Sequence, residues 1–200
     1  MKLKSLLGLG AWACVAMQAA CAGPDEPRAQ AALVTIDSAI PRDEELRRFR
    51  HGLIEPAGLT GGAPSRDALV GSFVSALEHG DTAALAALVI TKAEFAYIYY
   101  PTNPQAHPPY DLSPGLMWFM FQQNSHRGLV HALEERGGRS LGFLGYRCDR
   151  SPSREGANQV WGPCVIRRRQ AGGDVVAERL FGLILERGGQ YKFVSLANKL

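Results

Sequence analysis

The apolar positions of this chain follow a helical spacing in its middle part and a strand-like spacing in its last third. Ser65 is a suitable N-cap, the apolar residues after it recur three or four positions apart, and Gly80 follows them. This pattern predicts a helix that ends at about His79. Capping residues and apolar spacing predict further helices; these cover residues 41–53, 83–89, 92–99 and 113–137.

The last third predicts an antiparallel meander, because glycine-containing turns separate runs of aliphatic and aromatic residues. The expected strands are Leu141–Cys148, Gln159–Arg169, Val175–Arg187 and Gln190–Ala197. Pro163 predicts a bulge or an edge in the second of them. Helices followed by such a meander predict an α+β fold, with the helices packed on one curved antiparallel sheet.

The turn at Gly188-Gly189 predicts the register of the last two strands. A two-residue loop there pairs Arg187 with Gln190, Ile184 with Phe193, Leu183 with Val194 and Phe181 with Leu196. Both faces of this hairpin are then apolar. We expect helices to cover one face, and the amino-terminal segment or a second subunit to cover the other. The second option predicts a homodimer through the sheet face.

Short helices, a proline-rich connection and a terminal meander resemble the cone fold of the nuclear transport factor 2-like (SnoaL-like) superfamily. The resemblance covers residues 65–197 and is carried by the order of elements, by the helix junction EHGDTAAL at residues 78–85 and by the closing hairpin. It implies a conical pocket, which some members use for binding and others for catalysis. The expected domains are a signal peptide at 1–22, a tether and amino-terminal segment at 23–64, and a cone-fold domain at 65–200.

The amino end has the features of a secretory signal. Two lysines precede an apolar run that ends at Ala16, and this run is shorter than the roughly 20 residues of a membrane span. Residues 18–21 (QAAC) resemble a bacterial lipobox, in which Cys21 becomes the lipid-carrying first residue. Cleavage after Ala22 is the alternative. Both predict an exported protein of the cell envelope, and the lipobox predicts a membrane anchor.

The charge balance does not favour a nucleic-acid partner. Removal of the two signal lysines lowers Lys+Arg from 22 to 20 against 19 acids, so the formal net charge falls from +3 to +1. The run Arg167-Arg168-Arg169 is interpreted as a solvated sheet surface.

Two cysteines remain after the signal, Cys148 and Cys164, and their midpoint is Gly156. A hairpin that turns at Gly156 would place them opposite each other, which predicts a disulfide in an oxidising compartment. Two free thiols and a metal pair are the alternatives. A metal site is not expected, since the histidines are scattered along the chain and none lies near either cysteine.

Aromatic residues gather around the proline-rich connection; they are Phe95, Tyr97, Tyr99, Tyr100, Tyr110, Trp118, Phe119 and Phe121. Core packing is one interpretation. The functional interpretation is a pocket mouth, in which Tyr97, Tyr99 and Trp118 hold a flat, small apolar or lipidic ligand and Asp111 or His107 supplies a polar contact.

The leading hypothesis is a non-catalytic domain that binds a small ligand or a protein partner, with no cofactor. The second is a SnoaL-type isomerase or cyclase, with Asp111 as the acid/base and Tyr97 or Tyr99 as the oxyanion donor. Asp111 also suits a plain role as a charge near the start of a helix. The third hypothesis is a structural envelope component.

Overall fold

The computed structural model describes residues 40–149 and 151–198. The predicted signal peptide, Cys21 and residues 23–39 of the predicted tether and amino-terminal segment lie outside these residues. The helices come first: α1 (Arg42–Arg50), α2 (Arg66–His79), α3 (Thr82–Ala87), α4 (Lys92–Glu94), the π-helix η1 (Phe95–Tyr99), the 3-10 helices η2 (Tyr100–Thr102) and η3 (Pro104–Ala106), and α5 (Pro114–Arg136). Antiparallel strands follow them, so the predicted α+β class is confirmed.

Local sequence signals fix the start and end of the helices. The Ser65 hydroxyl accepts a hydrogen bond from the Ala68 amide at 3.1 Å, and Gly80 ends α2 in the left-handed conformation with φ of 67°. Thr91 and Glu94 form the predicted capping box. The single helix predicted at 92–99 is wrong in detail, because α4 is followed by the wider π-helix η1, whose aromatic residues pack in the core.

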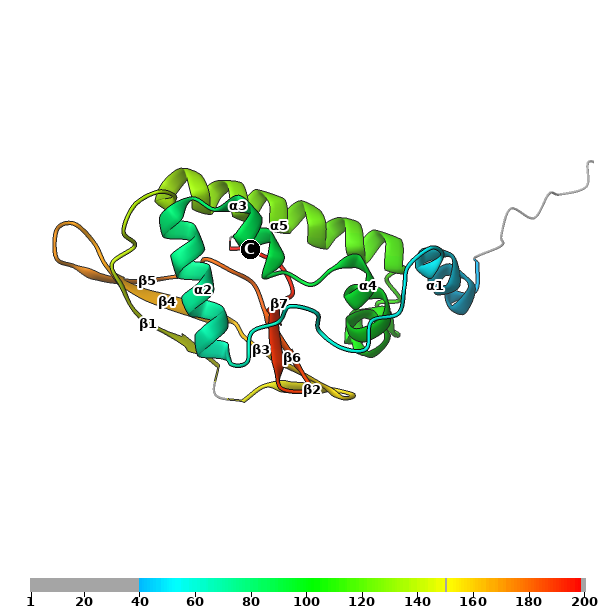
Figure 1. The fold of residues 1–200 in the computed structure, drawn as a ribbon. Coiled ribbons are helices and arrows are strands. Elements are labelled where there is room, and N and C mark those ends of the chain that lie inside the picture. Colours follow the sequence, from blue (N-terminus) through cyan, green and yellow to red (C-terminus); the bar gives the residue numbers. More distant parts are fainter. Residues whose placement is uncertain (1–39, 150, 199–200) are drawn as a thin grey trace, which may run out of the picture. The chain divides into compact units, whose positions relative to one another are not determined.

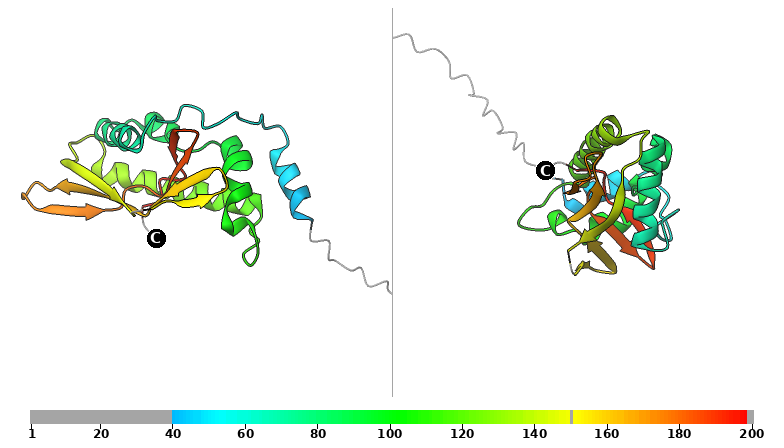
Figure 2. Two further views of the ribbon diagram at one scale, coloured as in Figure 1. Left: turned by 90° about the horizontal axis from the view of Figure 1, so that it is seen from below. Right: turned by 90° about the vertical axis from the view of Figure 1, so that its left-hand side faces the viewer.

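The strands form two sheets rather than one meander. They are β1 (Phe143–Cys148), β2 (Ser153–Glu155), β3 (Asn158–Trp161), β4 (Cys164–Arg169), β5 (Val175–Glu178), β6 (Ile184–Arg187) and β7 (Gln190–Phe193). One sheet has the order β1-β4-β5 and the other β2-β3-β6-β7. Figures 1 and 2 show α2 and α5 on the same side of the first sheet.

Two predicted strands were wrong because each one changes sheet partway along. The strand predicted at Gln159–Arg169 breaks at Gly162, whose φ is 137°, and at Pro163, which has no amide hydrogen for a ladder. The strand predicted at Val175–Arg187 ends at Glu178 and resumes at Ile184. The position of Pro163, predicted as a bulge or an edge, is therefore a full break between β3 and β4.

The predicted register of the closing hairpin is confirmed. Arg187 pairs with Gln190 and Ile184 with Phe193. Beyond the named strands, the Val194 amide donates to the Leu183 carbonyl at 2.9 Å, which continues the same register.

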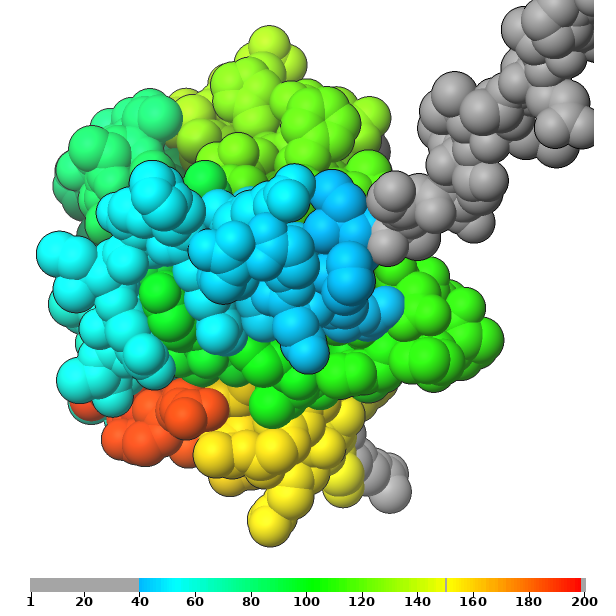
Figure 3. Space-filling model, turned by 90° about the vertical axis from the view of Figure 1, so that its right-hand side faces the viewer, coloured from blue at the N-terminus to red at the C-terminus, as the bar shows by residue number. Residues whose placement is uncertain are grey.

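Apolar residues cover both faces of this hairpin, as the pattern predicts. Ile184 and Phe193 belong to a cluster with Phe73 of α2, whereas Leu185 lies on the opposite face with Phe95 of η1. The amino-terminal segment helps to cover the second face, since the cluster there includes Leu59. The same segment pairs with the edge of β7 through a bridge from Ala63 to Tyr191. Figure 3 shows this segment in cyan, beside α1 in blue, over the green helical region. The hairpin therefore needs no second subunit to bury these faces.

The predicted disulfide joins Cys148 to Cys164, which are paired in the register of β1 and β4. The β2–β3 hairpin lies between them in sequence and turns at Gly156 with φ of 62°. The disulfide thus closes the base of an excursion in which the chain leaves the first sheet, adds two strands to the second and returns.

Candidate functional site

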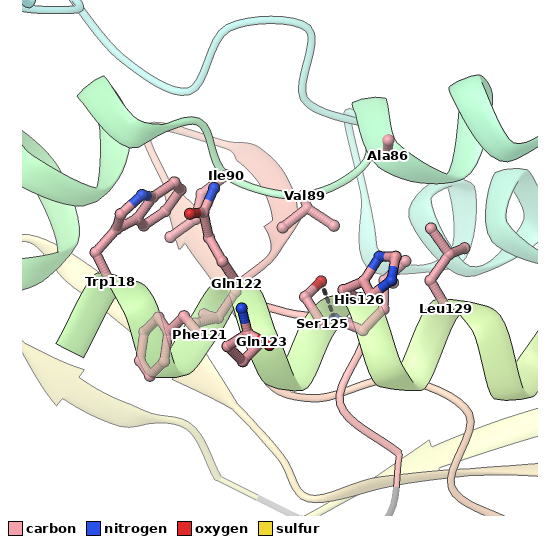
Figure 4. Close-up of a pocket in the computed structure, with 12 residues that line it drawn as sticks. Ala86, Val89, Ile90, Trp118, Phe121, Gln122, Gln123, Ser125, His126 and Leu129 are labelled. Carbon is pink, nitrogen blue, oxygen red and sulfur yellow. Dashed lines mark hydrogen bonds between the residues drawn. The ribbon is translucent and has the colours of Figure 1, made fainter. Parts of the chain in front are cut away.

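A groove runs between α5 and the segment that connects α3 to α4. It has a volume of about 370 Å³, which falls in the range of small-molecule sites. Figure 4 shows the lining side chains. The lining residues are Ala86, Val89, Ile90, Trp118, Phe121, Gln122, Gln123, Ser125, His126, Leu129, Val194 and Leu196.

Helix α5 supplies one wall through its periodicity. Ser113 caps the helix by accepting a hydrogen bond from the Leu116 amide, and Pro114 occupies its first turn. From there Trp118, Gln122 and Leu129 recur at helical spacing, so their side chains project from one side of the helix. The wall is therefore held by regular backbone, which orients its side chains more firmly than a loop would.

The opposite wall is fixed to the end of the last strand. The Ile90 amide donates to the Phe193 carbonyl at 2.9 Å, and the Phe193 amide donates to the Leu88 carbonyl at 2.9 Å. These two bonds hold Val89 and Ile90 beside the strand. Val194, the next residue after Phe193, also lines the groove.

The carboxyl-terminal segment approaches α5 closely at Gly128. A Cβ on Gly128 would lie 1.9 Å from the Leu196 carbonyl oxygen, so only glycine allows this contact. The Leu196 amide donates to the Ser125 hydroxyl at 3.0 Å, and the Asn198 side chain donates to the Gly128 carbonyl at 2.8 Å. The carboxyl-terminal segment is thereby bonded along α5.

The polar groups of the groove are neutral amides, a hydroxyl and an imidazole. Gln122 rises between Trp118 and Ile90, and His126 lies on the side of Leu129 (Figure 4). No Asp, Glu, Lys or Arg is among the lining residues of this groove. Its chemistry is therefore that of apolar contact and hydrogen bonds with amide, hydroxyl and imidazole groups. Within residues 40–149 and 151–198, no group of three or more His, Cys, Asp or Glu side chains is placed to hold a metal ion.

Of the residues predicted for a pocket, Trp118 lines the groove and Tyr99 lies behind it. The Tyr99 side chain is buried, and its ring centroid is 5.7 Å from that of Phe121, a lining residue. Burial, together with the negative charge of Glu155, raises the pKa of the Tyr99 phenol. Core packing is thus the role the structure gives to Tyr99.

The remaining predicted residues lie outside the groove. Tyr97 is half-buried, with the Arg50 guanidinium 4.4 Å from its ring centroid. His107 is exposed and its Nε2 lies 3.0 Å from the Pro101 carbonyl oxygen. Asp111 has a positive φ of 50° and its carboxylate accepts a hydrogen bond from Arg42. The structure therefore does not bring Tyr97, His107 and Asp111 to the groove around Trp118.

A second polar feature is a buried ion pair between Glu94 and Lys192. The two residues are 0% and 2% exposed, and the Lys192 Nζ lies 2.9 Å from Glu94 Oε2. Glu94 also accepts hydrogen bonds from the amides of Thr60 at 2.5 Å and Thr91 at 2.7 Å, and Lys192 donates to the Thr60 carbonyl at 3.1 Å. Because these charges are so fully bonded, the pair ties three chain segments together.

None of the helices within the described residues combines the length and the apolar character needed to cross a bilayer. Comparisons with protein-family models, with curated proteins and with solved structures found no match to this chain. The chemistry of the groove itself therefore carries the functional interpretation.

Proposed function

We propose that this chain is an exported, lipid-anchored protein of the cell envelope whose domain binds a small ligand in the α5 groove without catalysis. The observation that carries the proposal is a groove of about 370 Å³ whose lining mixes apolar side chains with amides, a hydroxyl and an imidazole and includes no Asp, Glu, Lys or Arg. Sites of this kind bind by burying apolar surface, and a few polar groups set the orientation of the ligand.

The lining favours an uncharged ligand. A charged group would lose its hydration in the groove without gaining an Asp, Glu, Lys or Arg partner, which is unfavourable. Trp118 offers a flat apolar surface, and Gln122 and His126 offer hydrogen-bonding groups at the rim. The ligand expected from these features has a planar or chain-like apolar body with one or two neutral polar groups.

The SnoaL-like cone is part of the same proposal. Its support is the element order, with helices before antiparallel strands, together with the change of sheet at Gly162 and Pro163, which bends the strand layer. The acid–base alternative has weaker support, because its expected acid/base Asp111 and its expected oxyanion donors Tyr97 and Tyr99 do not line the groove.

Replacing Trp118 with Ala is expected to weaken ligand binding by roughly tenfold or more, since it removes the largest apolar contact of one wall. The probe is N-phenyl-1-naphthylamine, a neutral apolar dye whose fluorescence rises in apolar surroundings, titrated into the full chain. Phe119→Ala is the matched control, because Phe119 is the next residue on α5, is 58% exposed and does not line the groove. Equal affinity of both variants for the dye would refute the groove as the binding site.

The lipid anchor at Cys21 is tested by intact mass of the protein from the membrane fraction. We expect a chain that begins at Cys21 and carries acyl groups. A soluble product that begins at Gly23 would contradict the anchor and would leave the groove proposal unaffected.

A further inference from the structure

Three arginines lie together on the outer face of the sheet β1-β4-β5. Burial alternates along β4 with its even-numbered residues buried, so Val165, Arg167 and Arg169 point away from the core. The register places Arg147 of β1 opposite Val165, on the same face. In Figure 2, left, no helix of the described chain lies in front of this face.

These arginines have no ion-pair partner among the described residues. The sequences of β1, β4 and β5 contain one acid, Glu178, and it lies on the opposite face, where it binds Arg168 and Arg136. The acids nearest in sequence, Asp149 and Asp174, lie beyond the strand ends. The outer face therefore carries uncompensated positive charge.

Two aliphatic side chains are exposed beside the arginines. Leu144 is 47% exposed where the β1 register shifts, and Val175 of β5 is 46% exposed. Arg167 has Gly145 on one side and Ala177 on the other, so no large cross-strand neighbour covers its guanidinium. Cationic and apolar groups thus share one uncovered surface.

We propose that this cationic face, made of Arg147, Arg167, Arg169, Leu144 and Val175, binds the surface of a bilayer that contains anionic lipids. Anionic headgroups would attract the guanidinium groups and relieve the repulsion between them. The aliphatic side chains would enter the boundary between headgroups and acyl chains. A soluble polyanion would use the arginines but would gain nothing from exposed Leu144 and Val175, so a bilayer fits the face better.

The test uses the unacylated chain, with Cys21→Ser in every variant so that no lipid anchor contributes. It measures co-sedimentation with vesicles of phosphatidylcholine alone or with one third phosphatidylglycerol. Arg147→Gln/Arg167→Gln is expected to lower binding to the anionic vesicles about 30-fold. The control Arg47→Gln/Arg48→Gln removes the same charge from exposed positions of α1, and it is expected to change binding by less than about twofold. An equal loss in both double variants, or no preference for anionic vesicles, would overturn the proposal.

A second variant separates the bilayer from a soluble polyanion. Leu144→Ser/Val175→Ser keeps every charge and is expected to lower vesicle binding about tenfold, because shallow apolar insertion is lost. If this variant bound the vesicles as the unsubstituted chain does, while the arginine variant lost binding to soluble polyphosphate, a polyanion site would replace the proposal. Unchanged far-ultraviolet circular dichroism shows that each variant is folded.

Discussion

Replacing Lys192 with Met is expected to lower the free energy of unfolding by about 3–5 kcal/mol, because it leaves the Glu94 carboxylate buried without its cation. The carboxylate keeps the amide hydrogen bonds from Thr60 and Thr91, but these carry no full positive charge. Urea unfolding of the full chain, followed by circular dichroism, measures the change.

Two further variants distinguish loss of the pair from loss of a lysine. Lys92→Met makes the same substitution at an exposed position, where the Lys92 Nζ lies 4.7 Å from the ring centroid of Phe49. It should change stability by less than about 1 kcal/mol. Glu94→Gln/Lys192→Met removes both charges and should recover about half of the loss. A loss below about 1 kcal/mol for Lys192→Met would mean that the pair is solvated.

Removal of the disulfide with Cys148→Ala/Cys164→Ala is expected to lower the free energy of unfolding by about 3 kcal/mol. The bond closes a chain segment with a sequence separation of 16 residues, and a loop of this size restricts the unfolded chain by roughly that amount. The urea unfolding transition of this variant should also be less cooperative, because no bond then closes the base of the excursion into the second sheet.

Reduction of the unsubstituted chain by dithiothreitol is the matched control. Its stability should fall to that of the double alanine variant, because both lose the same cross-link. Non-reducing peptide mapping should find Cys148 joined to Cys164. Free thiols at both positions, with no change of stability on reduction, would contradict the disulfide.

The parts of the fold that local signals determine were predictable from the sequence. Ser65 and Gly80 fix the ends of α2, and the Gly188-Gly189 turn fixes the register of β6 and β7, since in each case the deciding residues are neighbours in the chain. The disulfide was predictable for a related reason, because the symmetry of Cys148 and Cys164 about Gly156 follows from hairpin geometry.

The division into two sheets was not predictable from the same signals. Pro163 was interpreted as a bulge or an edge within one strand, although together with Gly162 it separates the end of β3 from the start of β4. Between β5 and β6 the sequence RLFGL remains apolar, because Leu180 and Phe181 pack in the core as irregular chain. An apolar run therefore continues where the strand does not.

The groove combines one predictable wall with parts that are distant in sequence. Trp118 was identified from its aromatic neighbourhood, and the helical spacing of α5 could have added Gln122. Val89 and Val194 come from segments about thirty residues before and seventy residues after Trp118. The hydrogen bonds of Phe193 with Ile90 and Leu88 bring these two segments together. The burial of Lys192 could not be predicted for the same reason, because its partner carboxylate, Glu94, comes from a distant segment of the chain.

The central claim is that a small uncharged ligand lies between α5 and the Val89-Ile90 segment. The most direct measurement is a titration of the isotope-labelled full chain with N-phenyl-1-naphthylamine, followed by amide and side-chain NMR shifts. The account predicts that the largest shifts occur at Val89, Ile90, the Trp118 indole and Gln122. Shifts confined to the exposed apolar residues Leu116, Phe119 and Met120 on α5 would contradict it.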